Sequence, residues 1–195
     1  MLALLAVALV TNPYFPLAPG MRWEYRGVEG GAPARDVVTV SSRTEMVDGV
    51  ECAVVHDLLY HRGRLVERTV DFYAQDGAGN VWYYGEDTAE LDSRGRVKST
   101  EGTWRAGRDG ARPGIFMPAH PHVGQRFQQE DYPGHAEDWF SVLAFGNRTL
   151  KTKEWTPLEP GVRDRKWYVR GIGLIAEETI KGGSDRLTLQ AFRTA

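Results

Sequence analysis

Short runs of β-branched and aromatic residues alternate with polar positions along most of the chain, and glycine-containing turns separate the runs. The run 36–45 is rich in valine and threonine, and Asp48-Gly49 separates it from the apolar run 52–60. Asp-Gly is a strong signal for a two-residue hairpin turn. The period of two and the regular turns therefore predict a meander of antiparallel strands.

Further turn signals extend this pattern to the end of the chain. Arg62-Gly63 precedes the run 65–74, residues 76–80 precede 81–84, and Gly182-Gly183 joins 174–180 to 187–192. Other β-rich runs lie at 126–131, 138–145, 149–155 and 166–169. A helical period has little support, so we expect an all-β fold in which an antiparallel meander forms a curved sheet or barrel. Glycine and proline crowd residues 102–124, which predicts a long irregular loop.

Length and composition predict one globular domain over residues 12–195. The chain has 195 residues, of which 42% are hydrophobic and 11% aromatic, enough for a sizeable core. The formal net charge is −2 and no block of like charge is present, which argues against nucleic-acid binding. Cys52 is the single cysteine, so an intrachain disulfide is excluded and a buried, unreactive thiol is expected.

Residues 1–11 form a separate apolar segment that resembles part of a secretory signal peptide. The first ten residues, MLALLAVALV, are all apolar. They are too few to span a bilayer, which takes about 20 residues, but they match the apolar middle of a signal peptide. We therefore expect export to the periplasm or the medium and no stable membrane span. The sequence gives no indication of the oligomeric state.

A histidine between carboxylates is the first candidate site. If Arg62-Gly63 is a two-residue turn, His56 lies opposite Thr69 and shares a face with Glu67 and Asp71. Two neighbouring carboxylates would raise the pKa of the imidazole and suit it to acid/base chemistry or a pH response. A structural polar cluster is the alternative interpretation.

A metal site is the second candidate. His120 and His122 are separated by one residue, and His135 is followed closely by Glu137. Zinc sites use histidine pairs with a third ligand, and a catalytic zinc keeps one position open. This spacing allows a zinc-dependent or histidine-assisted hydrolase with Glu137 or Glu154 as the base. The same prolines and histidines could also form a solvated loop.

Aromatic residues on many of the predicted strands are the third candidate. Six tryptophans exceed the usual need of a core of this size, and a curved sheet can enclose a cavity lined by rings. The predicted ligand-binding residues are Trp23, Tyr25, His56, Asp71, Tyr73, Trp82, Tyr84 and Trp155.

Five segments together resemble a family of exported bacterial proteins of uncharacterised function. They are NPYFPLAPGMRWEY, YAQDGAGNVWYYGED, RPGIFMPAHPHVG, TKEWTPLEPG and YVRGIGLIAEE, and they are spread over almost the whole chain. The resemblance implies export, a β-rich fold and a mature domain that begins near Asn12. It implies no activity, cofactor or catalytic residue.

These observations favour a non-catalytic exported protein that binds a small apolar or aromatic-compatible ligand, a lipid or a glycan, in a β cavity. The sequence contains no G-x-S-x-G, P-loop, G-x-G-x-x-G or H-E-x-x-H motif, so no familiar enzyme class is indicated. The hydrolase remains one alternative, and a structural or interaction module of the cell envelope is the other.

Overall fold

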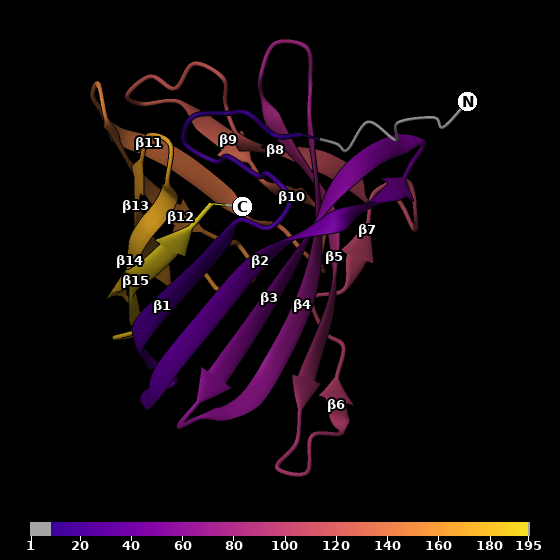
Figure 1. Ribbon diagram of the computed structural model, residues 1–195, viewed down its shortest axis with the longest axis vertical. Helices are drawn as coiled ribbons and strands as arrows, with labels where there is room; N and C mark the ends of the chain where they lie inside the picture. The colour runs from indigo at the N-terminus through magenta and orange to yellow at the C-terminus, as the bar shows by residue number, and fades with distance from the viewer. Residues whose placement is uncertain (1–8, 195) are drawn as a thin grey trace.

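The computed structural model describes residues 9–194, and all fifteen of its strands belong to one antiparallel sheet (Figure 1). No helix occurs within this range, which confirms the all-β prediction. The strands are β1 (Arg22–Glu29), β2 (Ala32–Val47), β3 (Val50–His61), β4 (Arg64–Gln75), β5 (Val81–Leu91), β6 (Val97–Ser99), β7 (Trp104–Arg105), β8 (Arg112–Met117), β9 (Arg126–Gln128), β10 (Glu130–Asp131), β11 (Trp139–Phe145), β12 (Thr149–Trp155), β13 (Arg163–Val169), β14 (Gly173–Lys181) and β15 (Arg186–Arg193).

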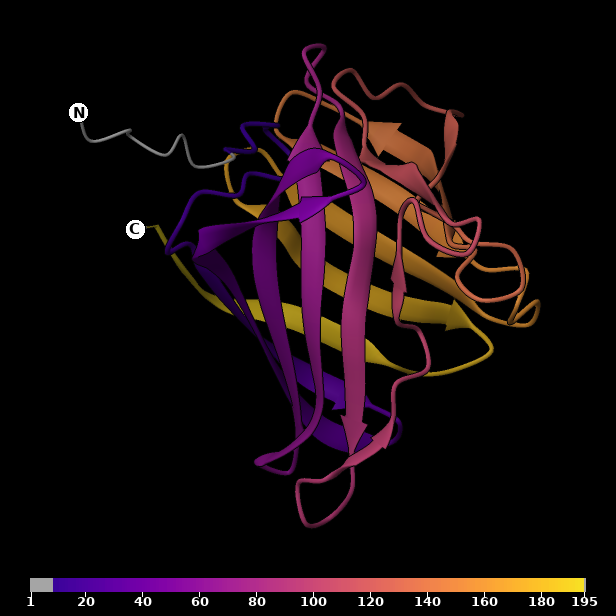
Figure 2. The same ribbon diagram turned by 90° about the vertical axis from the view of Figure 1, so that its right-hand side faces the viewer.

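The sheet curls into a nearly closed barrel whose two edges meet at one residue. Its strand order is β10-β8-β5-β4-β3-β2-β1-β15-β14-β13-β12-β11-β9, so the outermost strands are β9 and β10. These two strands are consecutive in the chain, separated by Gln129 alone. The Gln129 amide donates to the carbonyl of Asp138 at 2.7 Å. The inner faces of the strands therefore share one interior, around which the walls curve in Figure 2.

Residues 102–124 contribute to the barrel wall, which corrects the prediction of a long irregular loop. β7 and β8 lie in this stretch, and both pair with β5. β8 also pairs with β10 and is a strand of the barrel. Glycine is required here by close packing, because a Cβ at Gly114 would lie 2.3 Å from the carbonyl oxygen of Gln129. The glycine that suggested a loop instead allows two strands to meet at the closure.

The hairpin turns at Asp48-Gly49 and Arg62-Gly63 form as predicted. Their φ angles are 48° and 76° in the first turn, and 51° and 82° in the second. Positive φ at both central positions matches the right-handed twist of the flanking strands, which explains why such turns join neighbouring strands so tightly.

The segment that precedes β1 crosses one end of the barrel and forms a plug, residues 10–20, visible as the indigo loop in Figure 1. Asn12 holds it in place: its buried side-chain amide donates to the carbonyls of Gly79 and Pro118, each at 3.1 Å. The Tyr14 hydroxyl donates to the carbonyl of Gly146 at 3.0 Å. The plug thus connects turns that lie far apart in the sequence.

An aromatic cluster joins the plug to the barrel wall. The ring centroid of Phe15 lies 5.0 Å from that of Tyr73 and 4.5 Å from that of Phe116. Tyr73 and Tyr83 stack with centroids 4.7 Å apart. Such ring pairs add to the stabilisation from burial alone, so the plug end is the apolar end of the interior.

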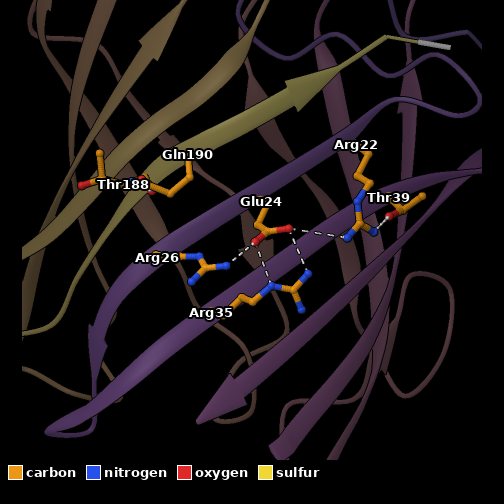
Figure 3. A network of polar contacts seen from close by, with 7 residues as sticks. All are labelled: Arg22, Glu24, Arg26, Arg35, Thr39, Thr188 and Gln190. Atoms are coloured by element: carbon orange, nitrogen blue, oxygen red, sulfur yellow. Dashed lines mark hydrogen bonds and ion pairs between the residues drawn. The ribbon is translucent and has the colours of Figure 1, made fainter. Parts of the chain in front are cut away.

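The outer surface of β1 carries charges, in contrast to its inner surface. Trp23 and Tyr25 point inward and are buried, whereas Glu24 between them points outward. Arg35 donates to both carboxylate oxygens of Glu24 at 2.9 Å, and Arg26 donates at 3.2 Å (Figure 3). The hydrogen bond from Arg35 chiefly lowers the pKa of Glu24, to about 2. An ion-pair network on the surface adds little stability, so we assign it no role in the site below.

Replacing Gly114 by alanine tests the closure of the barrel. We expect Gly114→Ala to lower the free energy of unfolding by about 1–3 kcal/mol, because the new methyl group would collide with the backbone where β8 meets Gln129. Urea unfolding followed by tryptophan fluorescence measures the change. Gly77→Ala is the control, because open space surrounds that position. Equal stabilities of the two variants would contradict this account of the closure.

Candidate functional site: the interior cavity

The barrel encloses a cavity of about 300 Å³ between the plug and the middle of the sheet. This volume is at the small end of the range for ligand pockets. The rings and aliphatic side chains that line it are those of Phe15, Trp23, Tyr25, Val38, Val55, Tyr73, Tyr83, Phe116, Leu174 and Leu187. The interior is thus not completely filled by its own side chains.

Four carboxylic acids form a row across one wall, one on each of the strands β2 to β5. Asp36, Asp57 and Asp71 line the cavity, and Glu86 lies directly opposite Asp71 on the neighbouring strand. Val38 pairs with Asp57, and Asp57 pairs with Thr69. Because side chains two positions apart share a face, the register places all four acids on the inner face of the wall.

The described residues provide few hydrogen-bond donors for these acids. Asp36 and Asp57 are hydrogen-bonded to each other, which requires a proton on one of the two carboxyl groups; this bond raises the pKa of Asp57 and opposes the rise in the pKa of Asp36. Apart from a protonated Asp57, the described residues offer Oδ1 of the buried Asp36 carboxyl no donor. Asp71, only 8% exposed, accepts from the Tyr83 hydroxyl at 2.6 Å. The same hydroxyl lies 3.2 Å from Glu86, but its single proton can serve only one of the two carboxylates.

Burial shifts these acids toward their neutral forms. Desolvation raises the pKa of Asp57 well above its usual value, and the charge of Asp36 adds to the effect. Desolvation likewise raises the pKa of Asp71 to about 7, against the opposing effect of the Tyr83 hydrogen bond. Burial and the charge of Asp71 raise the pKa of Glu86 to about 8. Near neutral pH the row therefore holds both protons and charges.

The opposite wall carries a cation that is already paired. Lys166 on β13 contacts Glu154 at 2.8 Å and Glu177 at 3.7 Å. Burial alone would lower the pKa of Lys166, but the two carboxylates outweigh it and hold the pKa well above its usual value. Glu154 also accepts from the hydroxyls of Thr152 and Tyr168. Among residues 9–194, this wall therefore provides no unpaired positive charge to neutralise the acids across the cavity.

Acidic groups greatly outnumber basic groups in the cavity lining. Among the described residues, Lys166 is the single basic side chain in the lining, and seven side chains are acidic. The acids are Asp36, Asp57, Asp71, Glu130, Asp138, Glu154 and Glu177.

A second hollow, of about 260 Å³, continues the cavity toward the end opposite the plug. It shares Lys166, Glu177 and Leu187 with the cavity, so these side chains stand between the two spaces. Glu29 and Asp185 lie farther out. Desolvation and the charge of Glu67 raise the pKa of Glu29 to about 7. Five acidic side chains and two basic ones, Lys166 and Arg186, line this hollow.

Four of the eight residues predicted to bind a ligand line the cavity: Trp23, Tyr25, Asp71 and Tyr73. Two of them are fixed by their polar ends, because the Trp23 indole donates to the carbonyl of Ile172 at 2.6 Å and the Tyr25 hydroxyl to that of Leu174 at 3.0 Å. Their rings are therefore held as rigid walls. That they contact a ligand stays a prediction.

The other four residues, His56, Trp82, Tyr84 and Trp155, do not line the cavity. Strand alternation turns Trp82 and Tyr84 away and places Tyr83 inside, a residue that sequence reasoning missed. Trp155 stacks on Trp139 with ring centroids 6.5 Å apart, while its neighbour Glu154 faces inward.

His56 lies on the outer face because the predicted register is wrong beyond the first two pairs of the β3–β4 hairpin. His61 pairs with Arg64 and Tyr60 with Leu65 as expected, but a bulge between Leu59 and Tyr60 then shifts the register by one residue. His56 consequently pairs with Val70 rather than Thr69 and is exposed. A shift of one residue moves a side chain to the opposite face relative to its partners, which separates His56 from Asp71.

The four residues predicted to bind a metal are not brought together. His120, His122 and His135 are exposed, and the His135 ring stacks on Tyr132. Glu137 accepts a hydrogen bond from the amide of Gly134 at 2.6 Å. Within residues 9–194, no three His, Cys, Asp or Glu side chains are grouped so that they could hold one metal ion. The geometry gives no support to a zinc-dependent hydrolase.

Cys52 is fully buried, as expected, and burial raises the pKa of its thiol to about 12. A thiol with such a pKa is a poor nucleophile at neutral pH. Cys52 is therefore a core residue.

Comparisons with known proteins show no family for this chain. No family model and no curated protein matches the chain. A crystal structure described as a putative lipoprotein from Parabacteroides distasonis is similar, with 10% sequence identity and a TM-score of 0.43, over 93% of this chain and 99% of that one. A likeness this distant carries no inference about function. Between residues 9 and 194 no helix has the length and apolarity needed to cross a membrane.

Replacing Asp71 by asparagine tests the electrostatics of the cavity. The pKa of the Asp71 carboxyl is about 3.9 in the unfolded chain and about 7 in the folded protein. Between these two pH values the unfolded chain gives up this proton more readily than the folded protein, so the folded state loses stability as the pH rises. We expect the ligand-free protein to lose stability from pH 5 to pH 8, and Asp71→Asn to reduce this loss by about 1–3 kcal/mol.

Urea unfolding at several pH values measures this dependence. Glu101→Gln, at an exposed position outside the cavity, is the control and should leave the slope unchanged. An unchanged slope in Asp71→Asn would show that Asp71 is solvated in the native protein.

Proposed function

We propose that the protein binds a small, partly apolar organic ligand inside the barrel, without catalysing a reaction on it. The observation that carries this proposal is the cavity itself: about 300 Å³ of space lined by aromatic rings that are held in place and by buried acids, among them Asp36, whose Oδ1 has no donor among the described residues. Protein interiors are usually close-packed, and the polar groups buried in them are usually hydrogen-bonded. A space that departs from both rules is best explained by an occupant.

The size of the cavity limits that occupant. At roughly 30 Å³ for each water molecule, the space holds about ten waters or an organic molecule of about that number of non-hydrogen atoms. This favours a compact ligand over a complete membrane lipid or an oligosaccharide.

Export belongs to the same proposal. It rests on the apolar run at residues 1–10 and on the resemblance of five segments to exported bacterial proteins. Residues 1–8 lie outside the part of the chain that the structure describes. Asn12 and Tyr14 of the first of these segments make buried contacts in the plug, and Val10 before them is buried as well.

A substitution that fills the cavity tests the proposal. Val38 on β2 lines the cavity, and Val38→Phe adds a ring to the space without a polar change. We expect native mass spectrometry of the wild-type protein to detect a noncovalent ligand, or saturation-transfer NMR to detect binding from a library of small organic compounds. Either signal should fall at least tenfold in Val38→Phe.

Val97→Phe is the matched control, since Val97 on β6 is exposed and outside the cavity. It should bind like the wild-type protein. If no compound binds, or if both variants bind equally well, the cavity is not the ligand site and the proposal fails.

A further inference from the structure

The cavity wall offers a ligand many hydrogen-bond acceptors. It provides hardly any positive charge that could neutralise its own acids. Lys166 is committed to Glu154 and Glu177, so it cannot neutralise Asp57 or Asp71 on the other wall. Asp71 is more than nine-tenths buried, lines the cavity and has the Tyr83 hydroxyl as its one donor among the described residues. A ligand that donates hydrogen bonds and carries positive charge would satisfy these groups.

Aromatic rings lie in the lining with these acids. Tyr73 is stacked on Tyr83, whose hydroxyl donates to Asp71, and Phe15 and Phe116 pack against Tyr73. Ring faces attract cations and also accept the apolar body of a ligand. Carboxylates beside rings are therefore suited to an ammonium group attached to an aliphatic or aromatic body.

Other ligand classes suit the lining less well. A carboxylate or phosphate would meet seven acids and one paired lysine. A bare metal ion needs several ligands close together, and no such group occurs in residues 9–194. The acids are spread over both walls, which suits an ion with a molecular body better than a bare ion.

We propose that the cavity binds a small organic amine, whose ammonium group is held by Asp57 and Asp71 and whose apolar body lies against the aromatic cluster of Phe15, Tyr73 and Phe116. This inference rests on the proposed function, since it names the chemical class of the ligand for the same cavity. In the lining of the outer hollow, acidic side chains outnumber basic ones five to two, with Arg186 and Lys166 as the basic pair, and this excess favours the approach of such a cation.

Calorimetry with matched probes tests the ligand class. The probes are 2-phenylethylamine and hexylamine, with 2-phenylethanol and hexanol as neutral isosteres and phenylacetate as the anion, each titrated into the full-length protein at pH 8. We expect at least one amine to bind at least tenfold more tightly than its alcohol, and phenylacetate not to bind.

Two variants locate the ammonium group. Asp57→Asn and Asp71→Asn should each weaken amine binding at least tenfold and leave alcohol binding within about twofold, whereas Glu101→Gln should change neither. Circular dichroism and unfolding curves check that the variants are folded. If the variants bind amines as the wild-type protein does, the assignment of the two aspartates is wrong.

The pH dependence gives an independent readout. The ionisable groups that face the ammonium position are the seven acids of the lining, Glu86 opposite Asp71, Lys166, and the hydroxyls of Tyr25, Tyr73 and Tyr83. Protonation of the acids removes the attraction, so amine affinity should fall at least tenfold from pH 8 to pH 5.5 while alcohol affinity stays constant.

The outcomes separate the two proposals. If alcohols bind as tightly as amines and binding is lost in Val38→Phe, the proposal of a ligand cavity stands and the proposal of an amine ligand is overturned. If none of the probes binds, the proposal that the ligand is a small organic amine is overturned. If the compound library also fails, the cavity proposal falls as well.

Discussion

The closure of the sheet at Gln129 is the constraint on which the rest of the structure depends. The chain passes from β9 to β10 through this one residue, and the two edges of a thirteen-strand path meet there. Closure removes the exposed edges that an open sheet would present. Closure also means that every second side chain of each strand points into a single interior. The chemistry of that interior is therefore decided by the alternation of residues along strands that are remote in sequence.

The acids in the interior lower the stability of the fold, as buried polar groups at functional sites often do. Acids such as Asp57 and Asp71 lose their hydration in the barrel, and the wall supplies them with few donors. Apolar side chains of similar size at these positions would pack without this penalty. The plug, held by Asn12 and by the packing of Phe15, provides stability elsewhere in the molecule. A fold that is stable elsewhere but keeps destabilising acids in its interior is expected when the interior serves binding rather than stability.

Local patterns in the sequence predict the fold well, but the face on which a residue lies depends on register. The two-residue turn at Arg62-Gly63 follows from local chemistry, whereas the bulge at Leu59 has no local signal and reverses the placement of His56. The consecutive aromatics 82–84 could not be assigned to faces without the β4–β5 register, so Tyr83 was missed. The acid row was missed for the same reason: Asp36 and Asp57 resemble ordinary surface acids until pairing places them inside.

Charge in the cavity and stability of the fold are coupled through protons. An empty cavity at neutral pH must either keep protons on acids such as Asp57 and Asp71 or hold unpaired negative charge, and both states have a cost. A bound cation would favour the charged forms, lower their pKa values and release protons on binding. By the same linkage, a ligand that binds the folded state alone raises the free energy of unfolding. On the proposed function, the acids that weaken the empty barrel would be the groups that stabilise the occupied one, and a cationic ligand would complement the fold in charge.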